Sequence, residues 1–446
     1  MPTRRSRSGR WGSRCRPRLA RRSPRWLRAI RPWKGARPLS EGSYDAIVVG
    51  ARCAGSPTAM LLARKGYRVL LLDKATFPSD TMSTHLVHPP GVAALKRWGL
   101  LERLEATGCP PIETYSFDFG PLTISGSPRP IDGVARAYCP RRTVLDQLLV
   151  EAAGTAGVEI REGFVVDEVL AADGTVTGVR GRAKRHAAAT ERARVVIGAD
   201  GRHSLVAKTV RPKEYDVRRS HLAMYYAYWS DLPADGFEAY IRTDNRRGWA
   251  AASTHDGLTV LPFGWPVEEF RPNRKDIEGN FYAAMDLAPE FAKRVRGAKR
   301  ESKFIGSADL PGYFRKPFGP GWALLGDAGY HKNPITAMGI NDAFRDAELV
   351  AGALDDFFSG RRTYEVGMSA YQQTRDRETL PVYEFTDEFA QLEPPPPERR
   401  QLLGAMCGNQ EAMDGFVSVQ AATLPAPAFF APENVGRMMA AAEPAT

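Results

Sequence analysis

The chain has few cysteines, and none of them stands in a pattern typical of a metal site or a disulfide framework. Five occur in 446 residues, with no CxxC pair and no regular spacing: Cys15, Cys53, Cys109, Cys139 and Cys407. This usage argues against a zinc site and against a disulfide-stabilised secreted domain, and it fits the reducing interior of a cell. We therefore expect a cytoplasmic protein with no bound metal.

Long hydrophobic runs and internal repeats are also missing. No apolar run reaches the roughly 18 residues that a transmembrane helix requires. No segment recurs at a fixed period, which argues against a repeat architecture. We expect no transmembrane segment.

Acidic residues are almost absent from residues 1–43. This segment holds 14 of the 62 Lys and Arg residues but only one of the 51 acidic residues, Glu41. The rest of the chain carries 48 bases and 50 acids, so the formal charge of +11 belongs to this segment. It has no hydrophobic period and no apolar core of a secretory signal, which predicts a disordered basic tail. A transit peptide, a nucleic-acid arm and an upstream misassigned start codon are the alternatives.

The most informative segment that is present extends from Tyr44 to Lys74. Residues 47–49 predict a buried strand that enters a glycine turn, residues 56–65 a helix, and residues 69–72 a second strand that ends at Asp73. This is the pattern of a dinucleotide-binding unit, in which the helix N-terminus binds the pyrophosphate and the carboxylate binds a ribose hydroxyl. The predicted cofactor-binding residues here are Gly50, Arg52, Ala54, Gly55, Asp73 and Lys74.

One residue departs from the glycine pattern. Arg52 stands where the middle glycine of GxGxxG normally lies. Its side chain either faces the ligand, where it would bind the pyrophosphate or approach the ring of the cofactor, or turns outward and caps the turn. We favour the ligand-facing alternative.

Two later strands end in the same way. Residues 194–199 lead into Asp200 and Gly201, and residues 321–325 lead into Gly326 and Asp327. The second of these continues into an amphipathic helix predicted from about residue 340 to residue 358.

The three strand ends, in this order, resemble those of the FAD-dependent aromatic hydroxylases (para-hydroxybenzoate hydroxylase-like, group A flavin monooxygenases). Geranylgeranyl reductases and flavin halogenases share this framework, and the resemblance covers residues 44–380. It implies FAD as cofactor and a Rossmann-like α/β fold with an inserted antiparallel sheet. It also implies FAD contacts for the following residues: Arg142, Val166, Asp200, Gly201, Gly326, Asp327, Pro334, Gly339, Ile340 and Asn341.

Several of these residues have a specific expected role. The first amides of the helix at Gly339, Ile340 and Asn341 would stabilise negative charge on the reduced flavin ring. The resemblance places Val166 against the adenine and Asp327 at the ribityl chain. For Arg142, the alternative is an arginine that solvates the start of a helix at residues 142–156. No role is assigned to His85, His88 or His331.

The hydrophobic period changes to two between residues 220 and 263, which predicts an antiparallel sheet. In the resembled family this sheet covers the flavin and forms the substrate pocket. Tyr226, Tyr228 and Trp229 are the predicted pocket residues, with core packing as the alternative for each of them. The predicted domains are a FAD-binding domain in two parts (44–212 and 312–380), a substrate domain (213–311) and a C-terminal helical segment (381–446).

The resemblance implies an NAD(P)H-dependent monooxygenase. In such an enzyme the nicotinamide reduces FAD, dioxygen adds to the flavin, and the flavin hydroperoxide oxygenates an apolar or aromatic small molecule. An isoprenoid-saturating reductase is the main alternative, and a non-catalytic flavin-binding regulatory protein is a third. Halogenation is disfavoured, because the resemblance implies a WxWxIP segment and a pocket lysine for a halogenase, and residues 263–266 (FGWP) do not supply that motif. A nucleic-acid partner is not expected, since no nucleic-acid-binding module is evident in residues 44–446.

Overall fold

The computed structural model describes residues 44–184 and 186–442, so the predicted basic tail, residues 1–43, lies outside the described residues. Its first sheet is built around the predicted strand at the start of the FAD-binding unit. In spatial order this sheet contains β19 (Phe318–Gly319), β20 (Trp322–Leu324), β10 (Ala189–Gly198), β1 (Tyr44–Val49), β2 (Val69–Leu72) and β7 (Glu159–Arg161). Along this order all neighbours are parallel except β19, which pairs antiparallel with β20. The antiparallel strands β8 (Phe164–Ala172) and β9 (Thr175–Ala183) join the same sheet through β10. The predicted Rossmann-like α/β fold is confirmed.

Both faces of this sheet are covered, which explains why its strands are apolar throughout. Ala46, Val48 and Leu71 face a core shared with helices, whereas Ile47 and Leu70 face the opposite core. The helices on the first face are α1 (Gly55–Arg64), α2 (Pro89–Arg97), α3 (Leu101–Glu105), α4 (Arg142–Thr155), α9 (Gly339–Phe358) and the start of α10 (Tyr364–Phe389). The second face packs against β8 (Phe164–Ala172), β9 (Thr175–Ala183) and α5 (Leu205–Val210).

The local predictions agree closely with these elements. The helix expected at residues 340–358 is α9. In the turn between β8 and β9, Asp173 and Gly174 have φ values of 50° and 76°. Two successive positive φ values are typical of the tight turns that connect hairpins. A further turn at Gly163, with φ of 64°, separates β7 from β8.

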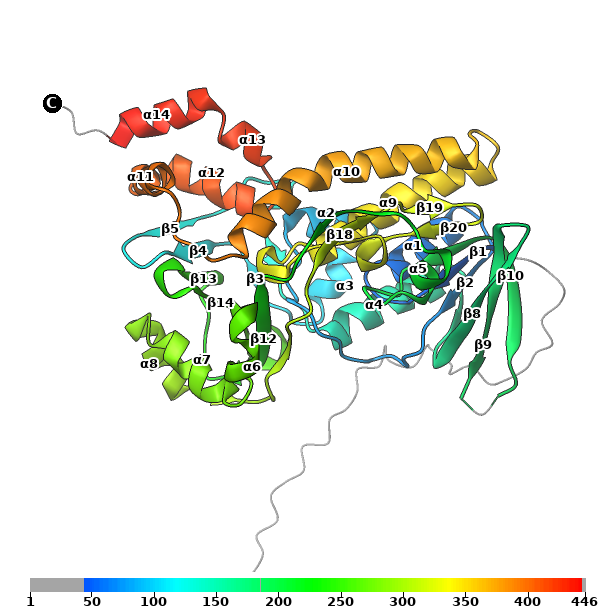
Figure 1. The fold of residues 1–446 in the computed structure, drawn as a ribbon, viewed down its shortest axis with the longest axis horizontal. Coiled ribbons are helices and arrows are strands. Elements are labelled where there is room, and N and C mark those ends of the chain that lie inside the picture. Colours follow the sequence, from blue (N-terminus) through cyan, green and yellow to red (C-terminus); the bar gives the residue numbers. More distant parts are fainter. Residues whose placement is uncertain (1–43, 185, 443–446) are drawn as a thin grey trace, which may run out of the picture.

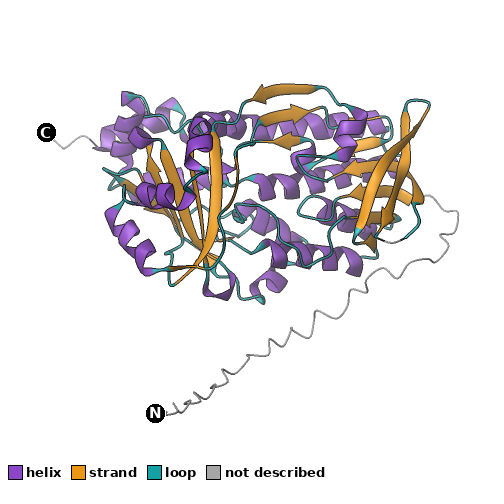
Figure 2. Cartoon of the chain, turned by 60° about the horizontal axis from the view of Figure 1, so that its bottom comes forward, coloured by secondary structure: helices purple, strands orange, loops and turns teal. Residues whose placement is uncertain are grey.

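The second sheet carries the predicted substrate domain. It contains β16 (Lys299–Arg300), β12 (Leu222–Ser230), β15 (Thr259–Pro266), β14 (Arg247–Ser253), β13 (Phe237–Arg242), β4 (Tyr115–Asp118) and β5 (Thr123–Gly126), with β17 (Ile305–Ser307) on β12. One face packs on α7 (Ile277–Met285) and α8 (Pro289–Gly297), which follow the short α6 (Phe270–Asn273). The other face contributes to a core with α11 (Pro397–Met406), α12 (Gln410–Gln420), α13 (Ala426–Phe429) and α14 (Pro432–Ala442). The second sheet and the β8–β9 hairpin lie at opposite ends of the molecule, with helices between them (Figure 1; Figure 2).

The predicted domain boundaries need two corrections. First, β4 and β5 fall inside the predicted first part of the FAD-binding domain, but β4 pairs in parallel with β13 and so belongs to the second sheet. Second, α10 crosses the predicted boundary at residue 380 and extends from the first sheet toward the C-terminal helices (Figure 1). Pairings between distant segments leave no local signal in the sequence.

Two smaller sheets complete the fold: β11 (Glu214–Arg218) with β18 (Gly312–Arg315) and β21 (Tyr330–His331), and β3 (Pro111–Ile112) with β6 (Ala137–Tyr138).

Candidate functional site

The glycine turn after β1 is packed too tightly for any side chain at two of its positions. A Cβ atom at Gly55 would lie 1.8 Å from the carbonyl oxygen of Gly50, and one at Gly50 would lie 2.3 Å from that of Ala199. Gly50 also has φ of 103°, which favours glycine. In the first turn of α1, Pro57 has no amide hydrogen, and the amides of Ser56 and Thr58 donate to the carbonyls of Arg52 at 3.1 Å and of Ala54 at 3.4 Å. The turn has the close backbone packing of a dinucleotide-binding site.

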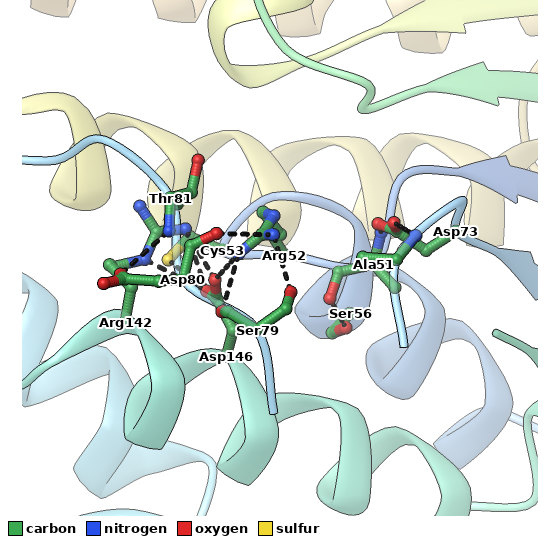
Figure 3. Close-up of polar contacts among 11 residues, drawn as sticks. Ala51, Arg52, Cys53, Ser56, Asp73, Ser79, Asp80, Thr81, Arg142 and Asp146 are labelled. Carbon is green, nitrogen blue, oxygen red and sulfur yellow. Dashed lines mark hydrogen bonds and ion pairs between the residues drawn. The ribbon is translucent and has the colours of Figure 1, made fainter. Parts of the chain in front are cut away.

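Two backbone amides hold the carboxylate of Asp73 next to this turn. Its Oδ2 accepts a hydrogen bond from the amide of Ala51 at 2.7 Å, and its Oδ1 accepts one from the amide of Ala75 at 2.7 Å (Figure 3). The carbonyl of Asp73 accepts from the amide of Phe164, which brings the start of β8, and with it Val166, to this end of β2. Lys74 is exposed beside it. The predicted ribose and adenine contacts are thus placed at one edge of the sheet, and they stay predictions.

The other predicted acids lie at the ends of neighbouring strands. Asp200 accepts from the amide of Leu205 at 2.7 Å, while its Oδ1 is buried and has no partner within the described part of the chain. Burial raises the pKa of Asp200. Gly201 and Gly326 have positive φ values, and a Cβ atom at Gly326 would lie 3.0 Å from the Cβ of Ala54. The exposed Asp327 directly follows Gly326. The ends of β1, β10 and β20, which carry the predicted glycine and acidic residues, lie at one edge of the parallel sheet, where ligands of such sheets bind.

The N-terminus of α9 is open. A Cβ atom at Gly339 would meet no protein atom within 4 Å, although Ile340 beside it is buried. Asn341 accepts from the amide of His88 at 3.2 Å through Oδ1, and its buried Nδ2 has no partner among residues 44–184 and 186–442. Pro334 begins the short 3-10 helix η6 (Pro334–Thr336) just before this terminus. The free space and the unpaired amide fit a bound planar group at the helix end.

A buried charge cluster fixes α9 beneath this opening. Lys332 and Arg345 both pair with Asp342, and Arg345 also contacts Asp346 at 3.2 Å. Asp346 accepts from the amide of Gly326 at 3.1 Å, which ties the Asp327 loop to the helix. Burial would raise the pKa of Asp342, but the two cations outweigh it and hold that pKa below its ordinary value. The i,i+3 spacing of Asp342 and Arg345 was a usable sequence signal for part of this cluster.

A second buried cluster joins the glycine turn to α4. Arg142 donates to both carboxylate oxygens of Asp146, at 2.8 and 3.0 Å, and Arg52 donates to the same carboxylate at 2.5 Å (Figure 3). The side chain of Asp146 is fully buried, and that of Arg142 is 9% exposed. The i,i+4 spacing of Arg142 and Asp146 predicts such a pair, but the role of Asp146 was missed. The FAD contact expected of Arg142 stays a prediction.

The structure supplies protein partners for Arg52. Besides Asp146, its guanidinium donates to Ser79 Oγ at 2.8 Å and to the carbonyls of Ser79 and Asp80 (Figure 3). It also lies over the ring of Phe77. The side chain is one quarter exposed. The Arg52 side chain is therefore held by protein partners, and it anchors residues 77–80 to the glycine turn. Contact with a cofactor phosphate stays a prediction.

Replacing Arg52 with glycine tests that prediction. We expect Arg52→Gly to lower the melting temperature, because Asp146 loses one counter-charge and residues 77–80 lose their anchor. We also expect the FAD dissociation constant to rise by about 10- to 150-fold, as the loss of a charge-assisted bond of roughly 1.5–3 kcal/mol implies. Titration of the apoprotein with FAD measures the second effect. Arg52→Lys is the matched control, since it keeps the charge but not the fork of donors. Unchanged FAD binding beside a lower melting temperature would show that Arg52 serves the fold alone.

An apolar cavity of about 80 Å³ lies between the second sheet and η6. Its lining includes Leu222 and Met224 of β12, Thr84, and Pro334 and Ile335 of η6. It contains no lysine. This places an apolar pocket directly beside the loop and helix end expected to hold the flavin.

Two of the three residues predicted for the pocket, Tyr226 and Tyr228, lie on the same face of β12 as the cavity-lining Leu222 and Met224, but neither is among the lining residues. Tyr226 and Tyr228 belong to the same core as Leu222, two and three positions along the same face. The prediction for Trp229 is wrong: it lies on the opposite face and stacks on Phe281 of α7 at 5.3 Å between ring centroids. The reason is the period of two in a strand, which sends neighbours to opposite faces.

Two absences hold for residues 44–184 and 186–442. No group of three or more His, Cys, Asp and Glu side chains is arranged to hold a metal ion. Nor does this part of the chain include a helix with the length and apolarity to cross a membrane.

Comparison with known proteins identifies the fold and the cofactor class. A family model described as an FAD binding domain matches residues 43–385. The 1H-pyrrole-2-carbonyl-[peptidyl-carrier protein] brominase of Pseudoalteromonas luteoviolacea is 26% identical over 331 residues, covering 71% of this chain and 79% of the brominase. The 6-methylpretetramide 4-monooxygenase of Streptomyces rimosus is 27% identical over 356 residues, covering 77% and 83%. A digeranylgeranylglycerophospholipid reductase of Methanosarcina acetivorans is 27% identical over 356 residues, covering 75% and 81%.

Solved structures agree with this fold. The myxobacterial chondrochloren halogenase CndH gives a TM-score of 0.73 at 22% identity, covering 90% of this chain and 96% of that one. PqsL of Pseudomonas aeruginosa in complex with 2-aminobenzoylacetate gives a TM-score of 0.65 at 20% identity, covering 84% and 100%. Halogenases thus stand among the relatives, although their expected motif is missing here, and halogenation returns as an alternative reaction.

Proposed function

Because the chain belongs to the FAD binding domain family, we propose that it is an FAD- and NAD(P)H-dependent monooxygenase acting on an apolar or aromatic small molecule. The observation that carries this proposal is the apolar cavity beside η6 and the open N-terminus of α9. The cofactor would supply the oxygen-activating redox chemistry once reduced. A relative that hydroxylates 6-methylpretetramide and a neighbour that holds 2-aminobenzoylacetate support a ring-bearing substrate.

The residues of this chain have separate roles in the proposal. The glycine turn with Gly50 and Gly55 would hold the pyrophosphate, and Asp73 and Asp327 would hold the sugar-like portions of FAD. The first amides of α9 would stabilise negative charge on the ring edge nearest them. The apolar walls of the cavity would exclude water from the reacting centre and orient the substrate.

Two observations weigh between the alternative reactions. The cavity lining has no lysine, and residues 263–266 lie at the end of β15 without the tryptophan pattern expected of a halogenase. Both argue against halogenation.

Dioxygen uptake separates these reactions. Holoprotein with NADH or NADPH is expected to consume dioxygen faster when a panel of phenols is added, with hydroxylated product by mass spectrometry. A second arm supplies reduced FAD with chloride or bromide, and a third supplies polyprenyl compounds without dioxygen. A halogenated product alone would identify a halogenase, and anaerobic alkene saturation would identify a reductase. Protein that cannot be reconstituted with flavin would overturn all three.

A further inference from the structure

Two glycines lie opposite each other in the middle of the second sheet. Gly248 of β14 is paired with Gly264 of β15, and their neighbours Trp249, Phe263 and Trp265 face the core with α7 and α8. Because neighbours in a strand point to opposite faces, the two glycines mark the face that carries the apolar cavity. Glycine inside a strand weakens the sheet, and it often marks a place where another group approaches the backbone closely.

Two side chains occupy the space over this glycine pair. A Cβ atom at Gly264 would lie 2.4 Å from the sulfur of Met224, and one at Gly248 would lie 3.5 Å from a methyl carbon of Leu392. Gly248, Met224 and Leu392 all line the cavity. Met224 and Leu392 therefore limit how far the cavity extends over the two glycines.

Leu392 reaches the cavity from the C-terminal end of α10. Its amide donates to the carbonyl of Phe389 at 3.1 Å, and the residue is 1% exposed. Its φ is 50°, a left-handed conformation that is strained for a bulky side chain. The Nε atom of Arg246, two residues before Gly248, donates to the carbonyl of Gln391 at 3.1 Å. This bond ties the strained segment to the strand on which Leu392 packs.

A run of prolines restrains the same segment from its other side. Residues 394–397 are all proline and lead from Leu392 into α11. Proline fixes φ, so this connection is stiff and holds Leu392 in place between α10 and α11. A strained residue persists only where its surroundings hold it, and such residues concentrate at ligand sites.

We propose that Leu392 sets the length of the substrate that the cavity accepts. Its side chain fills the space over Gly248 that an alkyl chain on a longer substrate would otherwise occupy. The inference rests on the proposed function, because it takes the cavity as the substrate pocket. It narrows the substrate class to compact ring-bearing molecules without an alkyl chain at the end that meets Leu392.

The test compares two probes that differ only in chain length. Isothermal titration of the FAD-loaded, oxidised protein would measure the dissociation constants of 4-methylphenol and 4-butylphenol. The ring and the hydroxyl are common to both probes, so their contributions cancel in the ratio of the two constants. In the wild type, 4-butylphenol should bind no more tightly than 4-methylphenol. Leu392→Ala should shift the ratio toward 4-butylphenol by about 10- to 50-fold, as burial of the additional methylene groups implies.

A second variant and a matched control accompany this one. Leu392→Gly opens the same space, and glycine suits the φ of 50°, so it should shift the ratio in the same direction even if Leu392→Ala is too unstable to purify. Leu403 of α11 packs against the same core but is not among the residues that line the cavity. Leu403→Ala should lower the melting temperature and leave the ratio of dissociation constants unchanged.

The opened space can also be filled again from the sheet. Gly248→Val in the Leu392→Ala background places a branched side chain over the strand, where such residues are tolerated, and should return the ratio toward the wild-type value. A double variant that keeps the preference for 4-butylphenol would show that the added chain binds elsewhere, and it would overturn the proposal.

Three further results would contradict the role of Leu392. These are an unchanged ratio in the flavin-loaded Leu392 variants, an equal shift in Leu403→Ala, and no binding of either probe to the Leu392 variants. The binding test needs no turnover. A length preference that depends on Leu392 would support the inference even if dioxygen uptake shows no oxygenation, so its failure and the failure of the proposed function are distinguishable.

Discussion

Replacing Asp146 with alanine should lower the free energy of unfolding by about 3–5 kcal/mol, the range expected when one partner of a buried ion pair is removed. Its carboxylate is fully buried and is shared by Arg52 and Arg142. Without it, the guanidinium of Arg142 would remain buried with no counter-charge in that cluster. Urea denaturation of both proteins, with the slope compared, measures the difference.

The surface pair of Arg180 and Glu168 is the control for this experiment. Their side chains are 56% and 47% exposed, with 2.7 Å between Nη2 of Arg180 and Oε2 of Glu168. Glu168→Ala should change the free energy of unfolding by no more than about 1 kcal/mol, as for exposed ion pairs in general. A loss in Asp146→Ala as small as that in Glu168→Ala would show that the two arginines find other partners or water.

Replacing Gly55 with alanine should abolish FAD binding, with the dissociation constant raised by more than about 100-fold, because a closed phosphate site loses several bonds at once. The added Cβ would lie 1.8 Å from the carbonyl oxygen of Gly50, so the turn must open or α1 must shift. Either movement displaces the helix N-terminus from the position at which it would meet the pyrophosphate. Flavin content after purification and titration of the apoprotein with FAD measure the effect.

Gly352→Ala provides the contrast. Gly352 lies within α9, and a Cβ atom there would meet no atom within 4 Å. This variant should bind FAD normally and should be more stable by roughly 0.5–1 kcal/mol, the helix-propensity difference between glycine and alanine. Full flavin content in Gly55→Ala would show that the glycine turn is not the cofactor site.

The strand and helix bounds near the glycine turn could be predicted because their signals are local. The apolar run before Gly50, the helix that follows and the acid at Asp73 lie within about thirty residues, and each is set by neighbouring residues. The same holds for α9, whose apolar stripe has the helical period. Membership of the FAD binding domain family agrees with what these segments predicted.

The candidate site was predictable only in part, for a related reason. A motif names the residues at a strand end but not the partners that reach them from elsewhere. The bonds from Arg52 to Ser79 and Asp146, and the meeting of His85 with Tyr226, join segments 27 to about 140 residues apart. The error for Trp229 is different, because the period of two already assigned it to the other face.

The sequence by itself determined the cofactor-binding framework: a parallel sheet with glycine and acidic residues at its strand ends, and an antiparallel sheet inserted between its parts. Only the tertiary structure decided that β4 and β5 complete the second sheet, that Asp146 holds two arginines, and that the ring of His85 meets that of Tyr226. The physical reason is that periodicity and turn chemistry act between neighbours in the chain. Strand pairing, charge burial and cavity lining depend on which distant segments the folded chain brings into contact.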